Sequence, residues 1–204
     1  MRIKTVLLDA DGVVQTASPG WRESVAALCP EPGSREEFLA DVFAAERPTV
    51  TGNGSFQPVL AEVLARWGSS TTVEEALRIW QLIEPQTSVL EQAQKLRGRG
   101  LRVCLATNQH PERAAFMSAS LGYQKMFDAL FYSCELGHAK PDGAYFRAVL
   151  RRLQQPGGEV LFVDDHPGNV EAAHAEGLHA RTYDLQTGEQ GMVELLAEFG
   201  LVDE

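Results

Sequence analysis

Short apolar runs alternate with helix-patterned stretches over most of the chain, and this alternation restricts the fold more than any other feature. The runs are short, continuous and rich in branched side chains, as in strands that are buried on both faces. They cover residues 3–9, 101–107, 129–133, 160–164 and 178–183. Helical spacing of apolar residues predicts helices at 88–98, 111–121, 142–153, 168–176 and 188–199. This order predicts an α/β fold with a three-layer, Rossmann-like core, in which a parallel sheet carries helices on both faces.

Residues 19–86 interrupt the alternation. Four stretches in this block place apolar residues at three-and-four spacing, and Gly-, Pro- and Ser-rich segments separate them. No stretch of the block matches a strand as well as the runs above. We therefore predict an inserted four-helix bundle at 19–86, with a core formed by 1–18 and 87–204.

Polar residues follow the apolar runs at the predicted carboxyl ends of strands, where parallel sheets bind their ligands. Asp9 and Asp11 follow the first run, and Thr107 and Asn108 follow the second. Lys140 stands in a Gly- and Pro-containing loop, and the run at 160–164 leads into Asp164 and Asp165. We expect these separate segments to meet at one place.

The spacing of Asp9 and Asp11 is informative because residues two apart in a strand point to the same side. Two carboxylates that close raise each other's proton affinity unless a cation lies between them. Such a pair suggests either a metal site or a nucleophile beside an acid/base. The same residues, followed by Gly12, are also compatible with an ordinary Asp-Gly turn.

The four motifs present, in order along the chain, a carboxylate pair, a hydroxyl, an ammonium and a second carboxylate pair. This order resembles that of the haloacid dehalogenase-like (HAD) hydrolase superfamily. Within it, the chain resembles the branch of small phosphatases with a helical cap, and the resemblance covers essentially the whole sequence. It implies a Mg²⁺-dependent phosphomonoesterase that hydrolyses a small phosphorylated metabolite, a sugar phosphate being one candidate, through an aspartyl-phosphate. The insert at 19–86 then corresponds to the cap that closes over the active site.

The resemblance also implies roles for individual residues. Asp9 is the expected nucleophile and Asp11 the acid/base. Thr107, Asn108 and Lys140 are expected to bind the transferring phosphoryl group, and the Lys140 charge offsets the surrounding carboxylates. The expected Mg²⁺ ligands are Asp9, the backbone carbonyl of Asp11, Asp165, and Asp164 directly or through water. Asn169 is expected to orient this shell rather than to bind metal.

Alternatives stay open at this stage. A 2-haloacid dehalogenase has the same fold, but those enzymes generally lack an acid at the position of Asp11, since a halide leaves without a proton. Phosphomutases and phosphonate hydrolases of the superfamily use a cap histidine or a cap lysine, and the block at 19–86 contains neither residue. A phosphorylatable receiver domain is disfavoured by the order of its motifs and by its shorter length.

Composition limits the partners. A formal net charge of −10 disfavours binding to nucleic acid, which requires a basic face. No apolar run is long enough to span a bilayer, no signal-peptide pattern opens the chain, and the three cysteines lack metal-ligand spacing. We therefore expect a cytoplasmic monomer or homodimer. His110 and His166 adjoin the motifs, so contact with the substrate stays open for them, but solvated loop residues are the favoured interpretation. In the insert, Trp21, Arg22, Arg47 and Asn53 are candidates for facing the pocket.

Overall fold

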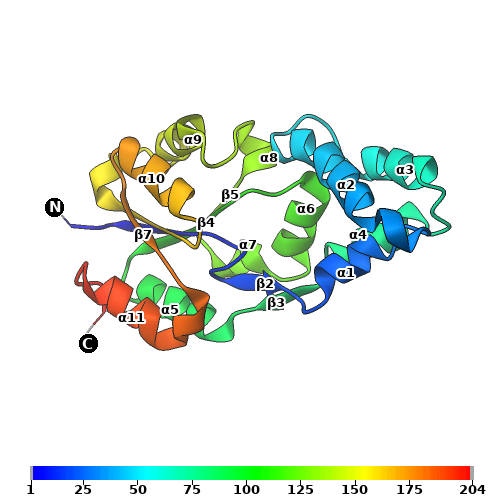
Figure 1. Cartoon of the computed structure of the whole chain (residues 1–204). Helices are drawn as coiled ribbons and strands as arrows, with labels where there is room; N and C mark the ends of the chain where they lie inside the picture. Colours follow the sequence, from blue (N-terminus) through cyan, green and yellow to red (C-terminus); the bar gives the residue numbers. More distant parts are fainter. Residues whose placement is uncertain (1, 203–204) are drawn as a thin grey trace.

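A five-stranded parallel sheet forms the centre of the computed structural model, which describes residues 2–202 (Figure 1). The strand order is β5-β4-β1-β6-β7, and every neighbouring pair is parallel. The strands are β1 (Thr5–Leu8), β4 (Arg102–Thr107), β5 (Ala129–Tyr132), β6 (Val160–Asp164) and β7 (His179–Thr182). Each lies within two residues of a predicted run, so the predicted α/β fold is confirmed.

Helices cover both faces of the sheet, as the buried strands require. Val6 and Leu8 of β1 pack into one apolar cluster with helices α5, α6 and α11, whereas Leu7 points into a second cluster with α9 and α10. The helices of the core are α5 (Thr87–Gly98), α6 (Pro111–Ala119), α7 (Tyr123–Met126), α8 (Ser133–Leu136), α9 (Gly143–Leu153), α10 (Pro167–Ala175) and α11 (Gly188–Ala197). Short 3-10 helices lie at Gly157–Glu159 and Leu185–Thr187.

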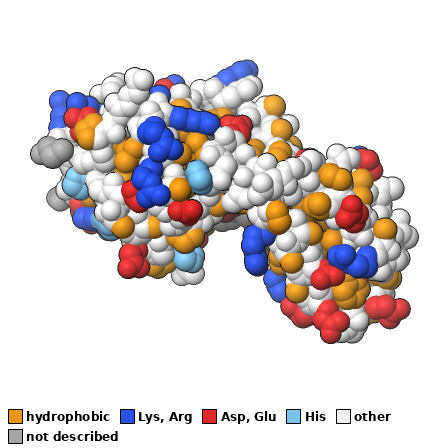
Figure 2. Space-filling model, turned by 90° about the horizontal axis from the view of Figure 1, so that it is seen from above, with side chains coloured by type: hydrophobic (Ala, Val, Ile, Leu, Met, Phe, Trp, Pro, Cys, Tyr) orange, Lys and Arg blue, Asp and Glu red, His pale blue; other side chains and the backbone are white. Residues whose placement is uncertain are grey.

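The insert forms a smaller lobe beside the sheet (Figures 1 and 2). It contains the four predicted helices, which enclose an apolar cluster of their own around Phe38, Phe56 and Trp80. Their bounds are α1 (Trp21–Ala26), α2 (Arg35–Val50), α3 (Phe56–Arg66) and α4 (Val73–Ile79), with a 3-10 helix at Pro32–Ser34.

A short antiparallel pair connects the two lobes, and here the prediction of an insert without strands is wrong. Strand β2 (Gln15–Ala17) pairs with β3 (Ile83–Pro85), so that the chain leaves and re-enters the core through adjacent strands. Three residues are too few to show a strand period, and the partners are far apart in the sequence. The local sequence pattern therefore could not predict this pairing.

The start of α6 also joins the lobes. Glu112 accepts hydrogen bonds from the Ser55 hydroxyl and from the backbone amides of Phe56 and Gln57, the first residues of α3. A carboxylate at this position satisfies amides that have no partner within the helix and interacts favourably with the helix dipole. One carboxylate of the core therefore caps a helix of the insert.

Candidate active site

The register of the sheet brings the four predicted motifs together. Leu8 lies opposite Leu105 on one side and Val163 on the other, so β1, β4 and β6 end at the same level. A cavity of about 270 Å³ opens beyond these ends. It is lined by Asp9, Asp11, Gly12, Thr107, Asn108, Lys140, Asp165 and Asn169. Of the predicted site residues, only Asp164 lies below this lining, fully buried.

Lys140 connects two of the carboxylates. Its Nζ lies 2.8 Å from Asp9 Oδ1 and 2.6 Å from Asp164 Oδ2, and its side chain is 1% exposed. Burial disfavours the ammonium, but the two carboxylates outweigh this effect and raise the pKa of Lys140. Burial also raises the pKa of Asp9 to about 7, reinforced by Asp164 and opposed by Lys140.

The loop that carries Lys140 is fixed by the motif after β4. Asn108 Oδ1 accepts a hydrogen bond from the Lys140 amide at 2.9 Å, and its Nδ2 donates to the Lys140 carbonyl at 2.8 Å. Asp142 caps α9 by accepting from the Ala144 amide, as its position after Pro141 predicts. In this structure, Asn108 therefore holds Lys140 in place.

Asp9, Asp164 and Asp165 form a group that could hold a metal ion. One oxygen from each lies within 4.8 Å of the others. Asn169 Nδ2 donates to both Asp164 oxygens at 3.0 Å, and the His166 amide donates to Oδ1 at 2.8 Å. Three carboxylates with one ammonium leave an excess of negative charge, and hard oxygen ligands suit Mg²⁺. The donors present fit such an ion.

Asp11 points away from this group and is held by three side chains. Arg113 donates to both carboxylate oxygens, at 2.6 and 2.8 Å, while Gln15 and Gln109 donate at 3.0 and 2.9 Å. Burial opposes ionisation of Asp11, but Arg113 and the hydrogen bonds outweigh it, so the pKa of Asp11 lies below its usual value. The Asp11 side chain is a firmly positioned carboxylate.

Sequence reasoning missed these three partners of Asp11. Gln15 lies in the short strand β2, and Gln109 and Arg113 follow the Thr107–Asn108 motif in the loop and first turn of α6. The start of α6 at Pro111 was predicted, and it would have placed Gln109 and Arg113 near the carboxyl edge of the sheet. Nothing in the sequence linked them to Asp11.

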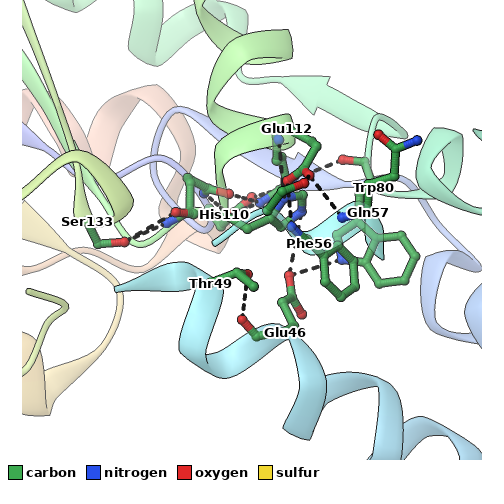
Figure 3. Close-up of polar contacts among 12 residues, drawn as sticks. Glu46, Thr49, Phe56, Gln57, Trp80, His110, Glu112 and Ser133 are labelled. Carbon is green, nitrogen blue, oxygen red and sulfur yellow. Dashed lines mark hydrogen bonds and ion pairs between the residues drawn. The ribbon is translucent and has the colours of Figure 1, made fainter. Parts of the chain in front are cut away.

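His110 is buried, contrary to the prediction of a solvated loop residue, whereas His166 is exposed. The His110 side chain is 1% exposed. Its ring packs against that of Phe56 of the insert, tilted by 48° with 4.7 Å between centroids, and lies 3.0 Å from Glu112 Oε2 (Figure 3). Burial lowers the pKa of His110 to about 4, against the opposing effect of Glu112. His110 is thus part of the junction between the lobes.

A second cavity, of about 310 Å³, lies between the lobes. It shares Asp11 and Gly12 with the first cavity and continues along Trp21, Trp80, Glu46 and Arg113. Of the four predicted insert residues, only Trp21 lines it. Arg22 pairs with Glu36 at the surface, and Arg47 and Asn53 are exposed.

Gly12 lets Asp165 approach the Asp9–Asp11 loop. Its φ is +84°, and a Cβ built there would lie 2.3 Å from Asp165 Oδ2. We expect Gly12→Ala to lower the free energy of unfolding by about 1–3 kcal/mol and to displace Asp165. Gly20→Ala is the matched control, because Gly20 has a φ of +78° with open space around it. Calorimetric titration with Mg²⁺ should show weaker binding for Gly12→Ala alone, and equal binding by both variants would contradict this interpretation.

The α/β core has carboxylates and a lysine at the carboxyl edge of its sheet, with a helical insert beside them. This arrangement fits the hydrolase class that the sequence predicted. The sequence profile of the haloacid dehalogenase-like hydrolases matches residues 3–177, and the chain belongs to this family. It is 24% identical over 182 residues to a phosphorylated carbohydrates phosphatase from Thermotoga maritima, covering 86% of this chain and 82% of that protein.

Two further similarities are informative. A sesquiterpene phosphatase from Aspergillus oryzae is 31% identical over 97 residues, so that the match spans about half of each protein, 47% of this chain and 49% of the relative. The fold matches a HAD family enzyme from Bacteroides thetaiotaomicron, solved with magnesium and inorganic phosphate, with a TM-score of 0.75 and 20% identity. That match covers 89% of this chain and 94% of the other. Among the described residues, no helix is long and apolar enough to cross a membrane.

Proposed function

We propose that the protein is a Mg²⁺-dependent phosphomonoesterase that hydrolyses a small phosphorylated metabolite through an aspartyl-phosphate on Asp9. The observation that carries this proposal is the bridge from Asp9 through Lys140 to Asp164, beside Asp165. Relatives that are phosphatases, and a fold neighbour solved with magnesium and phosphate, support it. Asp9, Asp164, Asp165 and the Asp11 carbonyl would hold the ion, which offsets charge on the phosphoryl group.

The free oxygen of Asp9 suits it for attack. Oδ1 accepts hydrogen bonds from the Ala10 amide at 2.7 Å and from Lys140, whereas no residue among 2–202 donates to Oδ2. In the first step an Asp9 oxygen attacks phosphorus and the bond from phosphorus to the ester oxygen breaks. Asp11, which is ionised beside Arg113 in the resting site and must first take up a proton from solvent, gives that proton to the ester oxygen. In the second step water attacks phosphorus, Asp11 takes a proton from the water, and Asp9 leaves with phosphate as product.

Other residues bind the phosphoryl group and exclude water. We propose that Thr107, Asn108 and Lys140 hold the phosphoryl oxygens. Arg113, Gln15 and Gln109 hold the Asp11 carboxylate where the two cavities meet, beside the path that the ester oxygen would take. Residues 19–86 act as a cap over the core residues 1–18 and 87–204, which strengthens the electrostatic contacts inside the site.

Assays of a generic aryl phosphate and 2-chloropropionate, each with Mg²⁺ and with EDTA, test the proposal. We expect hydrolysis of p-nitrophenyl phosphate that requires Mg²⁺ and stops on chelation. Full turnover in EDTA contradicts the metal role. Dehalogenation of 2-chloropropionate by a protein that ignores phosphate esters would instead establish the dehalogenase alternative.

A further inference from the structure

The chemistry of the second cavity indicates which leaving group the enzyme accepts, an argument that rests on the proposed phosphatase function. The two cavities meet at Asp11 and Gly12. A phosphoryl group on Asp9 therefore directs the rest of the ester past Asp11 into the space that Trp21 and Trp80 line. The walls of this space select among the alcohols that can leave.

Only one charge in these walls lacks a partner. The guanidinium of Arg113 is matched by Asp11, and its remaining contacts go to Gln109 Oε1 and the Trp80 carbonyl. Glu46 forms no ion pair with Arg113, although the Arg113 charge acts on it. Its Oε1 accepts a hydrogen bond from Trp80 Nε1 at 3.1 Å, and no residue among 2–202 donates to Oε2.

The histidine beside Glu46 does not supply the missing partner. In Figure 3 the Glu46 carboxylate lies between the ring of His110 and the indole of Trp80. His110 Nε2 is 3.7 Å from Glu46 Oε1, beyond hydrogen-bond distance, and is itself buried without a partner. Burial raises the pKa of Glu46 to about 7, against the opposing effect of Arg113. A cation in the cavity would stabilise the carboxylate.

The aromatic side chains that line the cavity also favour a cation. The rings of Trp21 and Trp80 meet edge to face, 5.8 Å between centroids, and both line the cavity. Indole faces attract ammonium groups and cover alkyl chains. The insert holds five arginines against ten acidic residues, and acidic side chains gather at the outer edge of the smaller lobe (Figure 2). The cavity walls themselves carry two carboxylates, Asp11 and Glu46, against one guanidinium, Arg113, and this excess of negative charge opposes an anionic leaving group.

We propose that this cavity binds an organic ammonium group, so that the substrates are phosphomonoesters of amino alcohols. The Glu46 carboxylate pairs with the ammonium, and the indoles of Trp21 and Trp80 pack against its alkyl part. A sugar would find few polar partners in such walls, and a carboxylate would be repelled by Glu46.

Steady-state kinetics with matched phosphate esters test whether the cavity binds an ammonium group. We expect kcat/KM for 2-aminoethyl phosphate to exceed that for n-propyl phosphate, its neutral analogue, at least about tenfold, with phosphoglycolate the poorest of the three. Glu46→Gln should reduce the ratio of kcat/KM for 2-aminoethyl phosphate to kcat/KM for n-propyl phosphate about tenfold. Glu37→Gln, an exposed carboxylate on the same helix, is the matched control and should leave the ratio unchanged. A ratio near one in the parent enzyme, or a ratio that survives in Glu46→Gln, overturns the proposal.

A binding measurement without turnover separates this proposal from the phosphatase assignment. Trp67 donates to Asp41 and packs on Phe38 away from the cavity, so Trp67→Phe leaves Trp21 and Trp80 as reporters. Tetramethylammonium should quench their fluorescence saturably, Glu46→Gln should weaken this binding, and neutral tert-butanol should have no comparable effect. Equal effects of the two probes would overturn the ammonium site. If p-nitrophenyl phosphate is not hydrolysed with Mg²⁺, the phosphatase proposal fails while this titration still tests the cavity.

Discussion

Replacing Asp9 with Asn should reduce phosphatase turnover by at least about a thousandfold, because the amide keeps the shape of the side chain but lacks the nucleophilic charge. Lys140 keeps its second carboxylate, Asp164, at 2.6 Å, so we expect the variant to fold. Steady-state assays with p-nitrophenyl phosphate measure the effect, and circular dichroism confirms the fold.

Two further measurements make the Asp9 experiment specific. Mass spectrometry of parent enzyme quenched in acid during turnover should detect the mass of one phosphoryl group, and Asp9→Asn should not carry it. Asp184→Asn is a matched control, since Asp184 is an exposed cap of a 3-10 helix and Asn can also accept the Gln186 amide. Turnover by Asp9→Asn near that of the control would remove Asp9 from the mechanism.

Replacing Lys140 with Met should have the largest effect on stability, because it leaves Asp9 and Asp164 buried beside each other without a cation. Breaking a buried ion pair by removing one partner costs about 3–5 kcal/mol, which corresponds to a Tm lower by about 10 °C in a chain of this size. Differential scanning calorimetry with EDTA measures the loss. Added Mg²⁺ should restore part of the Tm, because an ion bound by the same carboxylates replaces some of the missing charge.

The double variant Lys140→Met/Asp164→Asn tests whether charge is the cause. Removing one of the two carboxylates should recover part of the stability that Lys140→Met loses. Lys4→Met serves as the surface control, since Lys4 pairs with Glu159 at 2.7 Å but is 59% exposed, and the change should move Tm by less than about 2 °C. A Lys140→Met Tm as high as that of the Lys4 control would refute the argument.

The sequence predicted those parts of the fold and the site that local patterns encode. Continuous apolar runs indicated the strands. Asp9, Thr107 and Asp164 could be placed because each ends or directly follows a strand at the same edge, and Lys140 because it stands in a turn-forming loop. The roles given to these residues remain predictions. What geometry now adds is that Lys140 bridges two acids and that Asn108 holds its backbone.

The parts that escaped prediction depend on contacts between distant segments. Arg113 reaches Asp11 across 102 residues, and β2 pairs with β3 from Gln15 to Pro85, 70 residues apart. His110 is buried only because Phe56 of the insert covers it. Glu46 and Trp80 come together from α2 and the end of α4, and their spacing along the chain carries no signal.

The first turn of α6 limits how freely this protein could exchange its insert with that of a relative. Glu112 caps α3, and Arg113 binds both the Trp80 carbonyl and Asp11. A grafted insert without a matching helix start and carbonyl would leave the Glu112 carboxylate without its amide donors and Arg113 free to turn from Asp11. In a chimaera, or in divergence between relatives, the two lobes must therefore change together. The segment that can be exchanged as one piece is the insert plus residues 109–113, rather than the insert alone.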